Sequence, residues 1–200
     1  MPERVFLLSP AKASGVRMGH LLRPGASFDL ALKLQAGALT LGEAFEFASG
    51  LYFRGKRAYA RAFARPPRGV PGALVIAPGV GLVAEETKIS AAQLRALGEV
   101  PVDAAEPRFT GPLRESARLL ERAAARVVLL GSIASGKYVD PLLAVFGPRL
   151  LFPPAFVGRG DMSRGGLLLR CARDGAELEY APVEGAARRG PRPPRLPPVR

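Results

Sequence analysis

The stretch VVLLGSIASGKY, residues Val127–Tyr138, decides the fold class. Four apolar residues run into Gly131, and a helix-forming segment begins a few residues later at Lys137. A short run that is apolar throughout is typical of a strand buried on both faces, as in a parallel sheet with helices on either side. The stretch therefore predicts one strand–turn–helix unit of an α/β protein.

Further apolar runs predict the other strands of such a sheet. They are Arg4–Ser9, Ala73–Pro78 and Arg149–Pro153, together with the alternating segment Glu177–Val183, which is typical of an edge strand. Helices are expected between them, at residues 43–48, 55–64, 90–97, 111–125, 137–146 and 162–172. Thr40, with Glu43 in a capping box, and Ser90 are the predicted helix caps, whereas Pro10–Ser27 is expected to form a loop.

We therefore expect one α/β domain over residues 1–183, with a mostly parallel sheet flanked by helices. Residues 184–200 are expected to form a disordered, basic C-terminal tail rich in proline and arginine. From Gly185 onward this tail has five arginines, five prolines and no acidic residue.

The composition excludes several classes of site. Two hundred residues, 48% of them apolar, are enough for one buried core. No apolar run approaches the roughly 20 residues of a membrane span, and the N-terminal residues do not resemble a secretory signal, so we expect a cytoplasmic protein without a membrane partner. Cys171 and His20 are single, which excludes an intrachain disulfide and a cysteine-based zinc site, and we expect no metal and no cofactor.

The formal net charge of +12 comes largely from two segments. One is the tail, and the other runs from Arg54 to Arg68 and contains six basic residues and no acid. Spacings of three and four place most of the arginines of the second segment on one helix face. The predicted phosphate-binding residues are Arg54, Lys56, Arg57, Arg61 and Arg65. DNA is the expected polyanion, and a solvated helix face with a compositionally basic tail is the alternative.

Residues Gly131–Lys137 match the spacing G-x-x-x-x-G-K of a phosphate-binding loop. Tyr138 occupies the position where such loops place the Ser or Thr that binds Mg²⁺, and no later strand ends in a second magnesium ligand. We therefore do not expect nucleotide hydrolysis. Binding of a phosphate or a base by this turn, and a purely structural strand-to-helix turn, both remain open.

Ligands of open α/β sheets bind beyond the carboxyl ends of the strands. The residues that we expect there are Ser9, Lys12, Gly131, Gly136, Lys137, Tyr138, Arg159 and Arg164. Asp161 is predicted to be the N-cap of the last helix, between two arginines. Asp140 and Asp161 are the available carboxylates for a general base, although no paired acid and base can be identified.

Several short motifs resemble the YaaA family of bacterial peroxide-stress proteins. LLSPAK (Leu7–Lys12) is similar to the N-terminal signature of that family, and RGDMSR (Arg159–Arg164) to its C-terminal Arg-Gly-x-Met-x-Arg. Between them, LYFRGKRAYARAF, VIAPGVGLVAEETKI and GKYVDPL resemble related, uncharacterised bacterial domains in the same order. The resemblance implies an α/β core, DNA binding, a role in limiting oxidative DNA damage, and a cleft that includes Ser9, Lys12, Arg159, Met162 and Arg164.

Three functions remain open. The first is binding of DNA or a nucleotide in a basic cleft, with a role in the response to oxidative stress. The second is an enzyme that acts on a nucleobase or nucleotide, by glycosidic cleavage or base modification. The third is a protein that docks on an acidic partner through its basic tail. The sequence does not indicate the oligomeric state.

Overall fold

A computed structural model describes residues 3–124 and 126–196. The described part of the chain forms a six-stranded sheet in the order β3-β2-β1-β4-β5-β6. The strands are β1 (Val5–Leu8), β2 (Ala73–Ala77), β3 (Gly81–Ala84), β4 (Val127–Leu130), β5 (Leu150–Phe152) and β6 (Ala181–Pro182). The four inner strands are parallel, and β3 and β6 pair antiparallel at the two edges. The prediction of a mostly parallel sheet flanked by helices is therefore confirmed.

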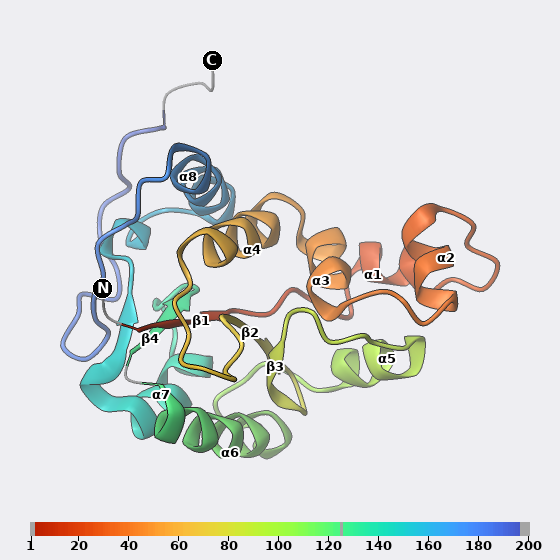
Figure 1. Ribbon diagram of the computed structural model, residues 1–200, viewed down its shortest axis with the longest axis horizontal. Coiled ribbons are helices and arrows are strands. Elements are labelled where there is room, and N and C mark those ends of the chain that lie inside the picture. The colour runs from red at the N-terminus through yellow and green to blue at the C-terminus, as the bar shows by residue number, and fades with distance from the viewer. Residues whose placement is uncertain (1–2, 125, 197–200) are drawn as a thin grey trace.

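Helices cover both faces of this sheet. In chain order they are α1 (Val16–Leu21), α2 (Asp29–Gln35), α3 (Leu41–Ser49), α4 (Leu51–Phe63), α5 (Ala91–Glu99), α6 (Pro107–Ala123), α7 (Gly136–Phe146) and α8 (Asp161–Asp174), with short 3-10 turns at Gly147–Arg149 and Pro154–Phe156. Figure 1 shows α4 and α8 on one side of the sheet and α6 and α7 on the other. The remaining helices, α1, α2, α3 and α5, lie beyond the carboxyl ends of the strands.

The apolar side chains of β1 contribute to a hydrophobic core on each face of the sheet. Phe6 and Leu8 point into the core beneath α4 and α8, whereas Val5 and Leu7 point into the core above α6 and α7. All four side chains are fully buried, as expected for the central strand of a parallel sheet. Burial on both faces is why this strand reads as a continuous apolar run.

Helix α4 crosses α8 at a pair of glycines. A Cβ on Gly55 would lie 2.6 Å from the carbonyl oxygen of Gly165, so only glycine at this point allows the two backbones to approach so closely. This contact fixes the position of α8 relative to α4. It also sets the place of the side chains that the two helices carry toward the carboxyl ends of the strands.

The structure corrects several predicted boundaries. Residues 10–27 are not all loop, because α1 buries Met18 and Leu21 against the core. The glycine-rich turn after β2 leads into β3, an edge strand that was not predicted. Helix α4 starts at Leu51 rather than near Gly55, and most of Glu177–Val183 is not strand. The cap of α8 is Gly160, with Asp161 as its first helical residue.

The predicted C-terminal tail has no helix or strand over residues 184–196. Its contacts include an ion pair between Arg188 and Asp140, and a hydrogen bond from Arg159 to the carbonyl oxygen of Pro194. Residues 197–200 of the tail, and Ala125 of the predicted helix 111–125, lie outside the described residues. The proposed disorder of the tail stays a prediction.

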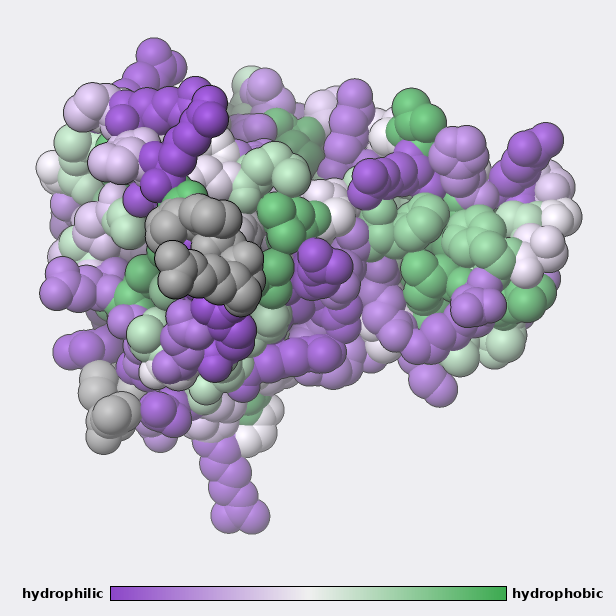
Figure 2. Space-filling view, turned by 90° about the horizontal axis from the view of Figure 1, so that it is seen from above, coloured by the Kyte–Doolittle hydropathy of each residue, from purple (hydrophilic) through white to green (hydrophobic). Residues whose placement is uncertain are grey.

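The surface seen in Figure 2 differs from one end of the molecule to the other. Hydrophilic residues dominate the face above α4 and α8, whereas hydrophobic residues gather around α2. Phe28, just before α2, and Leu32, within it, are 39% and 49% exposed. Phe28 also stacks on Phe47 of α3, which ties this outer helix to the rest of the fold.

The predicted capping box at the start of α3 is confirmed and gives a first test. The Thr40 hydroxyl accepts a hydrogen bond from the Glu43 N–H, and the Glu43 carboxylate accepts one from the Thr40 N–H. We expect Thr40→Ala to lower the free energy of unfolding by about 1 kcal/mol in urea denaturation. Ser27→Ala, at an exposed position without a capping role, is the control, and an equal effect of both changes would contradict the assignment.

Candidate functional site

A large cleft lies where the strand order reverses. From β1 the chain crosses to β2 on one side, and it later returns to β4 on the other side of β1. Open α/β sheets bind ligands in the crevice at such a switch point. A cleft of about 800 Å³ is found there, between the segments that follow β1, β2 and β4, the end of α5 and the starts of α7 and α8. We call it the switch-point cleft.

Five of the residues predicted from the sequence line this cleft. They are Ser9, Lys12, Lys137, Tyr138 and Asp161. Lys12 and Lys137 are exposed and come from opposite sides of the β1–β4 boundary, one after β1 and one at the start of α7. The structure therefore brings together segments that are more than a hundred residues apart in the sequence.

Gly131 and Gly136 belong to the backbone of the turn between β4 and α7. Gly131 is packed closely on Ser9, because a Cβ at this position would lie 2.9 Å from the Ser9 Cβ. This close approach joins the ends of β1 and β4, which form the base of the cleft. The two glycines thus shape the cleft rather than line it.

Two predicted residues lie elsewhere. The Arg159 guanidinium donates to the Ala155 carbonyl and to the Ser163 hydroxyl, and it does not line the cleft. Asp140 points to the surface, where it pairs with Arg188. Asp140, one of the two candidate carboxylates for a general base, therefore does not line the cleft.

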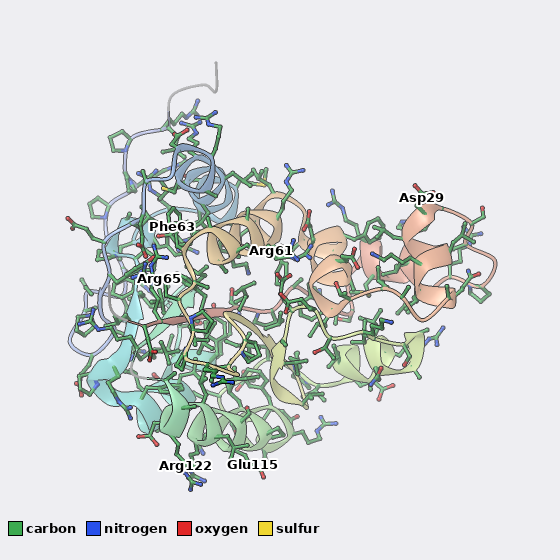
Figure 3. The ribbon with its side chains drawn as sticks, viewed as in Figure 1. Asp29, Arg61, Phe63, Arg65, Glu115 and Arg122 are labelled. Carbon is green, nitrogen blue, oxygen red and sulfur yellow. The ribbon has the colours of Figure 1, made fainter. Side chains whose placement is uncertain are left out.

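The predicted phosphate-binding face of α4 is also corrected. Lys56 and Arg57 are only 1% and 8% exposed, so they cannot hold a nucleic-acid backbone. The reason is that α4 is enclosed by the sheet, α3 and α8, and that its polar side chains bind other parts of the protein. Arg61, labelled in Figure 3, has an exposed side chain, but its Nε donates to the buried Glu85. Arg54 and Arg65 remain exposed.

Lys56 is the most unusual residue near the cleft. Its Nζ donates to the carbonyl oxygen of Ser9 at 2.6 Å and to the Ser9 hydroxyl at 3.0 Å. It also lies 4.3 Å from the centre of the Tyr52 ring and 4.7 Å from that of Phe53. No carboxylate of the described residues forms an ion pair with it. Burial lowers the pKa of Lys56 from 10.5 to about 7, with Asp161 opposing the shift and Arg164 adding to it.

Tyr52 lies one helical turn before Lys56 and lines the cleft. Its side chain is more than nine-tenths buried, and its hydroxyl has no hydrogen-bond partner within residues 3–124 and 126–196. A buried hydroxyl without a partner is unfavourable, because it has lost its hydrogen bonds to water without replacement. Burial also raises the pKa of Tyr52, although the nearby Arg164 guanidinium opposes this shift, so the hydroxyl keeps its proton.

Helix α8 supplies Asp161 to the lining of the cleft, whereas Arg164, which was also predicted there, is buried behind the lining. Arg164, 8% exposed, donates to the carbonyl oxygen of Phe156 and to Asp161 Oδ1, each at 3.2 Å. The Asp161 side chain is 71% exposed and faces the cleft. On the opposite side, burial raises the pKa of Tyr138, while the adjacent Ser9 hydroxyl opposes that shift.

The sequence did not lead us to predict that Tyr52 and Lys56 lie together at the cleft, although part of their pattern indicated that they are buried. Residues 52, 56, 59 and 63 share one face of a helix, and the aromatic residues Tyr59 and Phe63 mark it as the core side. Lys56 lies on that face and is therefore expected to be buried. The same reasoning places Tyr52 in the core, but its nearness to the cleft depends on the crossing of α4 and α8.

The buried lysine predicts an unusual pH dependence of stability. The folded state binds fewer protons than the unfolded state between the lowered pKa near 7 and the ordinary value of 10.5, so this group increases stability as pH rises through that range. We expect the unfolding free energy of the wild type to rise from pH 7 to 10 relative to that of Lys56→Met. Urea denaturation at several pH values measures the difference, and parallel profiles of the two proteins would contradict a buried, titrating Lys56.

The fold and the cleft define the protein as an open α/β-sheet protein with a polar cleft at its switch point. No protein-family model, no curated protein and no solved structure in the comparisons matches the chain. Within the described residues, no helix is both long and apolar enough to cross a membrane, and no group of three or more His, Cys, Asp or Glu residues is arranged to hold a metal ion.

Proposed function

We propose that the protein binds DNA or a nucleotide through the switch-point cleft. The observation that carries this proposal is the pair of exposed lysines, Lys12 and Lys137, on the two sides of a cleft at the site where α/β sheets take their ligands. A net charge of +12 favours a polyanionic partner and faster encounter with it.

The charge balance of the cleft agrees with an anionic ligand. Lys12 and Lys137 in its lining are offset by Glu99 and Asp161. Lys56 and Arg164, which are buried behind the lining of the cleft, supply additional positive charge. The Asp161 carboxylate already accepts from Arg164, which leaves Lys56 without an acidic partner. An anion in the cleft would supply that missing negative charge.

A salt titration tests the proposal. Each phosphate contact contributes about −0.9 to the slope of log K against log salt for duplex DNA. We expect the double variant Lys12→Gln/Lys137→Gln to bind DNA more weakly and to reduce the slope by about 1 to 2. The measurement is fluorescence anisotropy with a short labelled duplex and with its single strand.

The matched control removes two charges from the far face of the protein. Arg122, labelled on the outer side of α6 in Figure 3, and Arg118 are both exposed and distant from the cleft. Arg118→Gln/Arg122→Gln should leave the slope close to that of the wild type. Equal losses in both double variants, or no DNA binding at low salt, would overturn the proposal.

We propose that the protein limits oxidative DNA damage in the cell. This role follows from the resemblance to the YaaA family. Cells that lack the protein should then accumulate more DNA lesions after exposure to hydrogen peroxide. Complementation with the wild type, but not with Lys12→Gln/Lys137→Gln, is the expected result. Equal lesion counts with and without the protein would remove this role.

A second candidate is an enzyme that acts on a nucleobase or nucleotide. The observation that favours it is the position of Asp161, which is an exposed carboxylate in the lining of the cleft and is thus placed as a general base. Incubation with nucleosides and damaged DNA, with Asp161→Asn as the control, tests it. Substrates that remain unchanged with the wild type would exclude this candidate.

A further inference from the structure

The floor of the switch-point cleft contains more hydrogen-bond donors than the protein itself uses. The Tyr52 hydroxyl is buried and has no partner among the described residues. The Lys56 ammonium has three donors, and two of them go to Ser9. No acceptor atom of the described residues is bonded to the third, although the rings of Tyr52 and Phe53 lie beside the ammonium. A buried donor without an acceptor is unfavourable, so an acceptor bound here would be stabilised.

The charges around this floor favour an anion. Lys56 from α4 and Arg164 from α8 are buried cations, and the charged acceptor near them is Asp161 at the start of α8. The other polar groups that act here are Ser9 after β1 and the neutral phenols of Tyr52 and Tyr138. In addition, α7 and α8 both begin at the cleft, and the N-termini of helices favour negative charge.

We propose that the floor of the cleft binds a compact oxyanion, the phosphate group of the nucleotide ligand, to which Tyr52 donates a hydrogen bond while the Lys56 ammonium supplies the balancing charge. This inference rests on the proposed function for the identity of the whole ligand. It adds the orientation, with the phosphate directed inward and the rest of the ligand toward Lys12 and Lys137. A cleft of about 800 Å³ is large enough for a mononucleotide, so the ligand class is a nucleoside monophosphate or a terminal nucleotide of DNA.

Binding of such an anion has a consequence for protonation. Because burial lowers the pKa of Lys56 to about 7, the neutral form predominates at pH 8, and an anion beside it favours the charged form. Binding of the anion at pH 8 is therefore coupled to uptake of a proton. Sulfate is the best probe of this uptake, because it does not itself titrate in that range.

The experiment is isothermal titration calorimetry at pH 8 in two buffers of different ionisation enthalpy, Tris and HEPES. The ligands are sodium sulfate, a nucleoside 5′-monophosphate and the corresponding nucleoside. The expected result is binding of sulfate and of the monophosphate with uptake of a proton, and much weaker binding of the nucleoside. Buffer-independent heats, or equal affinity for the nucleoside and its monophosphate, would overturn the inference.

Variants separate this role from a structural one. Tyr52→Phe should weaken sulfate binding roughly 10-fold to 100-fold, because a hydrogen bond to a charged group is lost, and it should leave stability unchanged or higher, because it removes an unpartnered hydroxyl. Tyr59→Phe is the matched control. Its hydroxyl bonds to Tyr180 and accepts from the Leu178 N–H, so its loss should lower stability without changing sulfate affinity. Lys56→Met should abolish the proton uptake.

The outcomes distinguish this inference from the proposed function. Sulfate binding that depends on Tyr52, without binding of DNA or of the monophosphate, supports the oxyanion subsite and contradicts the proposed ligand. DNA binding that depends on Lys12 and Lys137 but is unchanged in Tyr52→Phe, together with no sulfate binding, contradicts the subsite and supports the proposed function.

Discussion

Replacement of Glu85 by alanine is expected to lower the free energy of unfolding by about 3 kcal/mol, because the buried Arg57 loses one of its two carboxylate partners. Glu85 is fully buried just after β3 and accepts hydrogen bonds from the Nε atoms of Arg57 and Arg61. Arg57 is itself only 8% exposed and also pairs with Glu46 of α3. The carboxylate thus joins α4 to the end of the β2–β3 hairpin.

The space for this pair is provided by Gly42 of α3. A Cβ there would lie 2.5 Å from Glu85 Oε2 and 2.8 Å from Arg57 Nε, so the helix passes directly over the ion pair. This cover excludes water, and removal of one partner is therefore costly. The loss should exceed that of an exposed ion pair, which is worth about 0–1 kcal/mol.

The neighbouring residue is the matched control for this prediction. Glu86 is exposed and forms no ion pair with a described residue, so Glu86→Ala should change stability by no more than about 0.5 kcal/mol. Equilibrium urea denaturation of both variants gives the comparison. A loss for Glu85→Ala that is no larger than the loss for Glu86→Ala would show that the carboxylate is not the buried partner of Arg57.

The strands were predictable because each central strand carries its own signal. A strand buried on both faces must be apolar throughout, and β1, β2 and β4 are found where such runs occur. The cap residues Thr40 and Ser90 were also predictable from local sequence, because a capping box depends on residues only three positions apart. The short helix α1 and the edge strand β3 were missed, since both lie in segments rich in glycine, where the pattern is weak.

Only part of the switch-point cleft could be predicted from the sequence. Ser9, Lys12, Lys137 and Tyr138 were found because the ends of parallel strands gather at one edge of the sheet, and this rule needs no knowledge of the packing. The burial of Lys56 and Arg57 was not predicted, because it depends on which helices enclose α4. The basic residues of α4 were predicted to bind phosphates from their charge alone. In the structure, Arg57 forms internal ion pairs with Glu46 and Glu85 instead.

The second large effect is expected from Gly165→Ala, at the crossing of α4 and α8. A Cβ on Gly165 would lie 2.7 Å from the Leu51 carbonyl oxygen and 2.8 Å from the Tyr52 Cα. Both are backbone atoms that cannot turn aside, so the helices must move apart. We expect a loss of about 1–3 kcal/mol in urea denaturation, despite the higher helix propensity of alanine.

The next residue gives a control of opposite sign. For a Cβ on Gly166 the nearest atom is Leu196 Cδ1 at 3.7 Å, an ordinary contact. Gly166→Ala should therefore increase stability by about 0.5–1 kcal/mol, because alanine costs less entropy than glycine inside a helix. Equal effects of the two changes would contradict a close crossing at Gly165.

The same crossing predicts a functional effect of Gly165→Ala. Helix α4 carries Tyr52 to the lining of the cleft, with Lys56 buried behind it, and α8 carries Asp161 to the lining, with Arg164 buried behind it. Separation of the two helices would widen the floor and draw Asp161 away from Lys56. Sulfate affinity measured by calorimetry should therefore fall in Gly165→Ala even where the protein is fully folded, whereas Gly166→Ala should bind as the wild type does. Unchanged affinity in Gly165→Ala would show that the floor does not depend on this crossing.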